Sequence, residues 1–446
     1  MPKLYFFFCR AAGHETAVGN EFLDSYFFHF IFLFLVLRVV FLHRIIYQNT
    51  FRRTPTNMTH NKKILSAVSY GAASAVFSIL VFFYAEFAKT QQVLPTFSAS
   101  VAPTAEFNIS ASEYPQTGAQ SCALIDAQSG QLLFSKNENE RLPMASTTKI
   151  MTAIIAIENK SLDDDVLIPK EAQNVEGSSI YLVAGEVLSL RELLYGLMLE
   201  SGNDAAIAIA IHTAGSVEKF CDMMNEKAKT LGLCNTNFEN PHGLSSENHY
   251  TTAHELAKIA AYAMKNEDFR KIVATEKYII DERENCRERY FFNHNRLLRS
   301  LDICDGMKTG YTLASGRCLV TSCTVENGRF VAVTLNDRDD WSDHKEMLLF
   351  ATSNFESVKI AAGGEIFFSY QTAASPKQTV SVTNTEDIYI TRKKGEDAAL
   401  NLSVEIGATS SLVGDTAGYL SVNDKENCFL FPLTVSGVRS ADGGCV

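Results

Sequence analysis

The chain has 446 residues, 46% of them hydrophobic and 20% charged, which is enough apolar material for two or three domains with their own cores. Disorder along the whole chain is therefore excluded. Forty Lys and Arg residues against 51 Asp and Glu residues give a formal net charge of -11. Because no basic excess is available to bind a phosphate backbone, nucleic acid is not an expected partner.

The first predicted element is an export segment over residues 58–89. Lys62 and Lys63 precede an uncharged, mostly apolar run over residues 64–85. The run has roughly 22 residues, which is long for a cleaved signal peptide and long enough to span a bilayer as a helix. A cleaved signal and a retained membrane anchor both stay open, and we slightly favour the anchor.

A second apolar stretch lies upstream, over residues 26–42, and is interrupted by His29 and Arg38. One interpretation is that the true start is Met58, which makes residues 1–57 a doubtful extension. The other is a hairpin with two membrane spans. We favour the start at Met58, on composition alone.

Residues 90–120 are rich in Ser, Thr, Ala and Pro and have neither helical nor strand periodicity, which predicts a tether. A domain is expected over residues 121–362, beginning with two strands and a turn over residues 122–135. Apolar spacing predicts helices over residues 146–159, 190–199, 204–214, 252–265 and 345–358. The helix over residues 204–214 is apolar all round, as in a buried core helix.

Three further strands are expected over residues 306–310, 318–324 and 330–335. Asn327-Gly328 joins the last two in a hairpin. This order of elements predicts an α+β domain in which helices cover an antiparallel sheet. Residues 363–446 show alternating Val, Thr, Ser and Ile, which predicts a separate small all-β domain.

The ten cysteines are scattered, with no C-x-x-C pair and no histidine at metal-ligand spacing beside them. A zinc site is therefore not expected. An even number in an exported chain is compatible with disulfides, but large domains also bury thiols routinely, and we favour thiols.

The first of three candidate motifs is Ser146-Thr147-Thr148-Lys149 at the start of a predicted helix. Ser146 and Lys149 are three residues apart, so both side chains project from one helix face. A serine needs an adjacent base to become a nucleophile, and a desolvated lysine with a lowered pKa can be that base. The spacing alone is weak, because it recurs over residues 216–219 and 342–345.

The second motif, Ser201-Gly202-Asn203, falls between two predicted core helices, where a hydroxyl and an amide can point into a cleft. Its alternative interpretation is a helix stop. The third, Lys308-Thr309-Gly310, lies on a predicted strand, and its alternative interpretation is an exposed edge strand. Each is weak alone, but their order and context match the signature set of penicillin-recognising serine enzymes.

At these motifs the chain resembles the low-molecular-mass penicillin-binding proteins, serine peptidases that act as D-alanyl-D-alanine carboxypeptidases. The resemblance runs from about Ser121 to the C-terminus and makes the domain over residues 121–362 a transpeptidase-like catalytic domain. Gly202 favours the carboxypeptidase branch, because class A β-lactamases usually carry aspartate there. The supporting segments are residues 142–153, 199–206, 240–244 and 305–312.

The resemblance implies a role for each motif residue. Ser146 would attack the carbonyl between the two terminal D-alanines of a peptidoglycan stem peptide, with Lys149 taking its proton and an acyl-enzyme following. Ser201 would relay a proton to the leaving amine, and Asn203 would hold the substrate amide and Lys149. Lys308 would add positive potential near the substrate carboxylate.

Thr309 would hydrogen-bond that carboxylate beside Gly310, and the backbone N–H groups of Ser146 and Tyr311 would form the oxyanion hole. A β-lactam would acylate the same serine and leave slowly. No metal or organic cofactor is implied. The expected partners are the pentapeptide stem, β-lactams as inhibitors, and the membrane through the N-terminal apolar segment, at the extracytoplasmic face of a bacterial membrane or in the cell wall.

Alternative functions differ in what they require of the sequence. A β-lactamase needs a second base for deacylation, and no Glu-x-x-Leu-Asn lies between the second and third motifs. A noncatalytic penicillin-binding protein would normally have lost Ser146 or Lys149. DD-endopeptidase activity on cross-links is a variant of the first function and stays open.

Three other residues have weaker indications. His242, in a turn signal, and Trp341, the only tryptophan, are interpreted as structural residues. Some relatives have an arginine near the last strand that helps bind the substrate carboxylate; Arg338 lies nearby but is not aligned with it. Relatives often end in an amphipathic membrane helix, and this sequence shows no such pattern at its C-terminus.

Overall fold

The computed structural model describes residues 114–372, 375–396, 400–406, 412–424 and 427–440. The predicted extension over residues 1–57, the export segment over residues 58–89 and most of the predicted tether lie outside these residues. No helix in the described part of the chain is long and apolar enough to cross a membrane.

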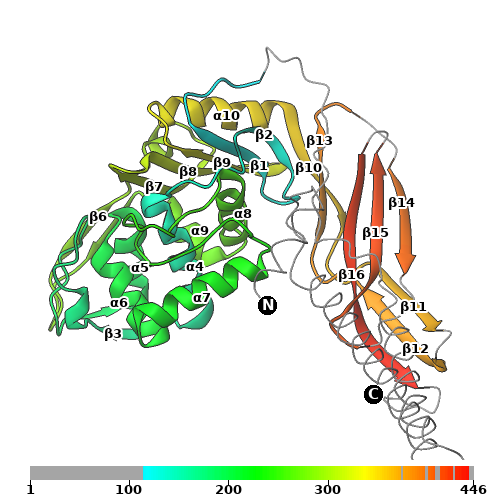
Figure 1. Ribbon diagram of the computed structural model, residues 1–446, viewed down its shortest axis with the longest axis horizontal. Helices are drawn as coiled ribbons and strands as arrows, with labels where there is room; N and C mark the ends of the chain where they lie inside the picture. The colour runs from blue at the N-terminus through cyan, green and yellow to red at the C-terminus, as the bar shows by residue number, and fades with distance from the viewer. Residues whose placement is uncertain (1–113, 373–374, 397–399, 407–411, 425–426, 441–446) are drawn as a thin grey trace, which may run out of the picture. The chain divides into compact units, whose positions relative to one another are not determined.

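A five-stranded antiparallel sheet in the order β2-β1-β9-β8-β7 forms the frame of the predicted catalytic domain over residues 121–362, which we call the catalytic region (Figure 1). Every residue of β1 pairs with β9, so in this sheet the strand that comes first in the sequence lies beside the one that comes last. The predicted hairpin joins β8 to β9, with Val325 opposite Gly328. The strands are β1 (Ser121–Asp126), β2 (Leu132–Lys136), β7 (Cys304–Thr312), β8 (Gly316–Val325) and β9 (Gly328–Leu335).

Both faces of this sheet are covered. Successive side chains of a strand point to opposite faces, and in β9 Val331 and Val333 belong to one core cluster while Phe330 and Ala332 belong to another. Helix α8 (Ala253–Ala263) packs on the first face and α10 (Asp340–Asn354) on the second (Figure 1).

The last helix of the catalytic region differs from the sequence prediction at both ends. It was expected over residues 345–358, but α10 begins at Asp340 and ends at Asn354. Its first turn holds polar side chains that make tertiary contacts, such as Asp340 with Arg317. The apolar residues after Asn354 belong instead to β10 (Phe355–Ala361), which pairs with β13 (Ile388–Lys393).

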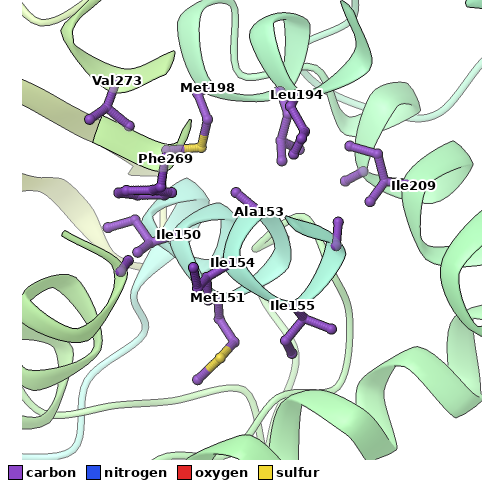
Figure 2. Close-up of a cluster of buried hydrophobic side chains, with 14 of the residues drawn as sticks. Ile150, Met151, Ala153, Ile154, Ile155, Leu194, Met198, Ile209, Phe269 and Val273 are labelled. Atoms are coloured by element: carbon purple, nitrogen blue, oxygen red, sulfur yellow. The ribbon is translucent and has the colours of Figure 1, made fainter. Parts of the chain in front are cut away.

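A cluster of helices surrounds α4 (Lys149–Asn159), whose residues from Lys149 to Ala156 are all buried. Leu194, Met198, Ile209, Phe269 and Val273 from three neighbouring helices lie around it (Figure 2). Burying one such side chain contributes about 1.5–3 kcal/mol, so the start of α4 is firmly placed. The helices in contact with α4 are α5 (Leu190–Leu199), α6 (Asn203–Ala214), α7 (Val217–Thr230), α8 and α9 (Glu267–Ala274).

Short elements connect these helices and strands. Two antiparallel pairs form, β3 with β4 and β5 with β6. These strands are β3 (Asp165–Leu167), β4 (Val187–Ser189), β5 (Lys277–Ile280) and β6 (Arg289–Phe292). The 3-10 helices are η1 (Ala145–Thr148), η2 (Lys170–Ala172) and η3 (Arg296–Arg299).

The C-terminal region is built from strands, as predicted. A five-stranded antiparallel sheet in the order β11-β12-β16-β15-β14 encloses an apolar cluster that includes Val380, Leu420 and Leu433. Its strands are β11 (Phe367–Thr372), β12 (Ser375–Thr383), β14 (Asn401–Ile406), β15 (Thr416–Asp424) and β16 (Asn427–Ser440). The strand β10, which directly follows α10, begins at Phe355, before the predicted start of the β domain at residue 363. That domain boundary stays a prediction.

Candidate active site

The first motif lies on a tight turn that leads into the buried helix α4. Ser146 is in η1, and Lys149 is the first residue of α4. The residue before the serine, Ala145, has φ +47, a conformation that side chains disfavour. The hydroxyls of Thr147 and Thr148 donate to the carbonyls of Met144 and Ala145 at 2.6 and 2.8 Å. These bonds hold the turn that presents Ser146.

The side chain of Lys149 is fully buried and has three polar neighbours. Its Nζ lies 2.9 Å from Ser146 Oγ, 2.7 Å from Asn203 Oδ1 and 2.6 Å from the carbonyl oxygen of His242. Burial lowers the pKa of Lys149 well below its usual value, the nearby charge of Lys308 lowers it further, and Asp204 opposes them.

These neighbours determine which way the neutral amine points. An amide oxygen and a carbonyl can only accept, so Asn203 and His242 use the two N–H groups of a neutral Lys149. The lone pair then faces the hydroxyl of Ser146. The amide of Asn203 is oriented by its own Nδ2, which donates to the carbonyl of Glu176 at 2.6 Å.

The second motif occupies the break between α5 and α6. Ser201 is buried at φ +63, Gly202 is the N-cap of α6, and Asn203 is its first residue. The helix-stop interpretation therefore describes the backbone correctly. It does not account for Asn203, whose side chain joins Lys149 to the loop at Glu176.

The third motif lies on β7, an edge strand of the sheet. Lys308 is nonetheless buried, and its Nζ donates to the carbonyl of Thr309 at 2.9 Å. Burial lowers the pKa of Lys308 to about 7, against the opposing charge of Glu200. Tyr311, the next residue but one after Thr309, is 62% exposed.

Gly310 brings this strand against the serine turn. A Cβ built on Gly310 would lie 3.0 Å from the backbone N of Ser146 and 3.0 Å from the Cβ of Ala145. A side chain there would push the two segments apart. The structure therefore brings the first motif together with the second through Asn203 and with the third through Gly310.

Residues 240–244 belong to the same site, although sequence reasoning assigned them no chemistry. The backbone carbonyl of His242 holds Lys149, and the carbonyl of Pro241 accepts from Thr152 at 2.6 Å. Gly243 has φ +92, and a Cβ there would come within 1.9 Å of the carbonyl oxygen of Ala145. The N-P-H-G turn signal was the available clue to this close approach.

The imidazole rings near Lys149 are neutral. Burial, with a smaller contribution from Lys149, lowers the pKa of His242 to about 3, and its Nδ1 accepts from the N–H of Leu244 at 3.2 Å. Burial also lowers the pKa of His249 to about 4, and its Nε2 lies 2.8 Å from the hydroxyl of Thr148. The ring of His242 therefore packs as a structural group, while its carbonyl contacts the lysine.

Trp341 packs against two guanidinium groups. Arg296 and Arg317 lie 5.8 and 5.9 Å from its ring centroid, and Arg317 donates to Asp340 at 2.6 Å. This is a packing role. Arg338 is exposed in the turn between β9 and α10. The described part of the chain contains no group of three His, Cys, Asp or Glu side chains that could hold a metal ion.

A serine hydroxyl beside a buried lysine, flanked by a helix break and an edge strand, is an arrangement suited to a serine acyl-transfer enzyme, in which a lysine can take the place of histidine as the base. The family model described as D-alanyl-D-alanine carboxypeptidase, peptidase family S11, matches residues 108–339. The chain belongs to this family.

The sequences of individual relatives support membership of this family. The chain is 37% identical over 289 residues to D-alanyl-D-alanine carboxypeptidase DacF of Bacillus subtilis, covering 63% of this chain and 74% of the relative. It is 32% identical over 316 residues to DacC of Escherichia coli, covering 66% and 76%.

Solved structures of similar fold support the same family. Penicillin-binding protein 5 from Haemophilus influenzae has a TM-score of 0.61 and 28% identity, covering 72% of this chain and 98% of that one. The Streptomyces K15 DD-transpeptidase has a TM-score of 0.51 and 32% identity, covering 53% and 97%.

The predicted family, fold class and activity are thereby confirmed. The chain is a serine-type DD-carboxypeptidase of peptidoglycan, with an α+β catalytic region followed by an all-β region. The family implies a peptidoglycan stem peptide as substrate and binding of β-lactams.

Proposed function

We propose that Ser146 is the nucleophile of the carboxypeptidase reaction and that Lys149 is its base. The observation that carries this proposal is the 2.9 Å approach of Lys149 Nζ to Ser146 Oγ, with Asn203 and His242 occupying the other side of the amine. A base must be neutral before it accepts a proton, and burial favours the neutral amine.

The reaction proceeds through two acyl transfers. Ser146 Oγ attacks the carbonyl between the two terminal D-alanines, and its proton passes to Lys149. The C–N bond breaks, D-alanine leaves as the amine with a proton relayed through Ser201, and an ester on Ser146 remains. Water then hydrolyses this ester, which releases the shortened peptide and restores the hydroxyl.

The third motif binds the substrate in this proposal. Lys308 supplies positive charge near the terminal carboxylate, because a pKa of about 7 leaves it partly protonated at neutral pH. Thr309 hydrogen-bonds that carboxylate. The backbone N–H groups of Ser146 and Tyr311 stabilise the oxyanion, and Gly310 provides the close approach of the two segments that this requires.

We also propose that the apolar run over residues 64–85 brings the enzyme to the extracytoplasmic face of the membrane. A basic flank followed by an apolar run of this length supports export. The N-terminal mass of the mature protein would distinguish an anchor from a cleaved signal. A mature chain that stays in the cytoplasm would contradict the proposal.

D-alanine release from a diacyl-L-Lys-D-Ala-D-Ala peptide tests the catalytic proposal. The purified full-length chain is compared with Ser146→Ala and with Ser342→Ala, a matched control whose exposed serine has the same S-x-x-K spacing in α10. We expect release by the parent and by Ser342→Ala, and none by Ser146→Ala.

Two other outcomes would change the proposal. Release by Ser146→Ala at the parent rate would remove Ser146 as the nucleophile. If the parent releases no D-alanine while penicillin labels it at Ser146, the nucleophile stands and the substrate must be a cross-linked or longer peptide, as for a DD-endopeptidase.

A further inference from the structure

Asp204, the second residue of α6, has a buried carboxylate that none of the proposed catalytic roles uses. Its Oδ2 accepts from the hydroxyl of Ser179 at 2.6 Å and from the N–H of Leu182 at 3.0 Å. The N–H of Ile180 lies 3.1 Å from both oxygens, and the N–H of Ala205 donates to Oδ1 at 2.9 Å. Three of these donors come from one loop, which therefore folds around Asp204.

This loop, residues 176–182, which we call the clamp loop, also holds the amide of Asn203. The carbonyl of Glu176 accepts from Asn203 Nδ2 at 2.6 Å, while Asn203 Oδ1 lies 2.7 Å from Lys149 Nζ. The contact is close, because a Cβ on Gly177 would come within 2.6 Å of Asn203 Nδ2. The position of the clamp loop therefore sets the direction of the amide oxygen that contacts Lys149.

A second anchor holds the clamp loop from β6. Arg289 donates from Nε to the carbonyl of Ile180 at 3.0 Å and from Nη2 to that of Tyr181 at 3.2 Å. It also forms a buried ion pair with Glu186 at 2.6 Å. Between these anchors Tyr181 has φ +60, a conformation that costs about 1–3 kcal/mol and persists only where the surroundings enforce it.

We propose that Asp204 is a positioning residue of the carboxypeptidase reaction. It acts through the clamp loop and Asn203 to keep Lys149 against Ser146, and this rests on the proposed role of Lys149 as base. A carboxylate suits this role because both of its oxygens accept. An asparagine would turn one N–H₂ group toward donors of the clamp loop.

The test measures acylation by penicillin in the full-length chain, separating the limiting first-order rate from the noncovalent dissociation constant. In Asp204→Asn we expect the limiting rate to fall about 10- to 100-fold, because the base is displaced from the hydroxyl. The dissociation constant stays near the parent value. Asp163→Asn is the matched control, since this carboxylate is 82% exposed, and we expect it to acylate at the parent rate.

A double-mutant cycle separates positioning through Asn203 from a general structural effect. If Asp204 acts through Asn203, then Asp204→Asn has less than about a twofold effect on the acylation that remains in Asn203→Ala. The proposal would be overturned if the rate loss in the double variant equalled the product of the losses in the two single variants. Equal acylation of Asp204→Asn and the parent would overturn it as well.

A milder variant covers the case in which Asp204→Asn does not fold. Ser179→Ala removes one donor to Asp204 and is expected to slow acylation about three- to tenfold; an unchanged rate would overturn the proposal. Failure of the parent to acylate at Ser146 would reject the proposed nucleophile and this inference together. If the parent is acylated at Ser146 and the Asp204 and Ser179 variants acylate at the parent rate, only this inference is rejected.

Discussion

The catalytic region and the C-terminal β region bury different kinds of polar group. In the described residues beyond residue 361, the buried polar side chains are Asn384, Thr391 and Ser421, and none of them is charged. The catalytic region buries Lys149, Lys308 and Asp204 within the same site. A buried charge destabilises a protein by several kcal/mol unless hydrogen bonds and opposite charges compensate it.

This difference distinguishes burial that only stabilises the fold from burial that also changes the pKa of a side chain. The β region encloses mainly Val and Leu side chains, as an ordinary core does. In the catalytic region the same burial that disfavours a charged lysine lowers the pKa of Lys149, as its proposed role of base requires, and lowers the pKa of Lys308 to about 7. The comparison therefore predicts which substitutions alter activity and which alter only stability.

The largest expected effect is that of Lys149→Met, which removes the base while keeping an apolar chain of similar length. Acylation by penicillin should fall about a thousandfold or more. The melting temperature should change little, because losing a buried amine stabilises while unsatisfied acceptors on Asn203 and His242 destabilise. Lys345→Met, at an exposed S-x-x-K lysine, is the control. If Lys149→Met acylates at the parent rate, the burial of Lys149 does not serve catalysis and the comparison between the two regions fails.

Gly243→Ala should have the next largest effect. The new Cβ would meet the carbonyl oxygen of Ala145 and displace the turn that holds Ser146, so acylation should fall about 100-fold. Gly364→Ala in the β region is a matched control, since Gly364 also has a positive φ of +80 but nothing within 4 Å of the new Cβ. It should cost only about 1 kcal/mol of stability and leave acylation unchanged. Equal acylation rates for the two variants would contradict this prediction.

Leu433→Ala should have the opposite effect, lowering stability without changing acylation. Leu433 is fully buried in the β region, and its truncation should destabilise that region by about 2–5 kcal/mol. Limited proteolysis and thermal unfolding measure this loss, with the partly exposed Leu430→Ala as a control of smaller effect. The penicillin acylation rate should not change. A slower rate would mean that the β region supports the active site.

The pH dependence of peptide hydrolysis should give the smallest effect. Neutral Lys149 is required, so the limiting rate should fall as the pH drops through its lowered pKa. Lys308 loses its charge as the pH rises through about 7, so the KM for a substrate with a free carboxylate should increase several-fold above that pH. A substrate amidated at that carboxylate should not show the alkaline change in KM. If both substrates show it, Lys308 does not bind the carboxylate.

The strands of the main sheet and five helices were predictable because their signals are local, whereas α7, α9 and the short strands β3 to β6 were not predicted. Alternation and the Asn327-Gly328 turn identified the hairpin of β8 and β9, and apolar spacing identified α5 without error in its bounds. The bounds of α10 were not predictable from spacing. Asp343 in its first turn accepts from Thr117 and Gly118, residues over 220 positions earlier in the chain.

The candidate site was predictable where it depends on side-chain chemistry. The hydroxyl, amine and amide groups of the site are supplied by few residue types, and their spacing forms recognisable motifs. The residues concerned are Ser146, Lys149, Asn203 and Lys308. The contacts made by the carbonyls of Glu176 and His242 gave no such signal, because every residue has a carbonyl. Asp204 adjoins a motif, but its partners lie in a loop more than twenty residues away.

The sequence by itself determined the family, the strands of the main sheet, several of the helices and the residue types available for acyl transfer, because local pattern and short motifs encode them. Only the tertiary structure decided that Lys149 is buried, that its amine faces Ser146, and that Asp204 folds the clamp loop against Asn203. Burial and direction depend on distant segments that pack together, and no local pattern specifies where those segments meet.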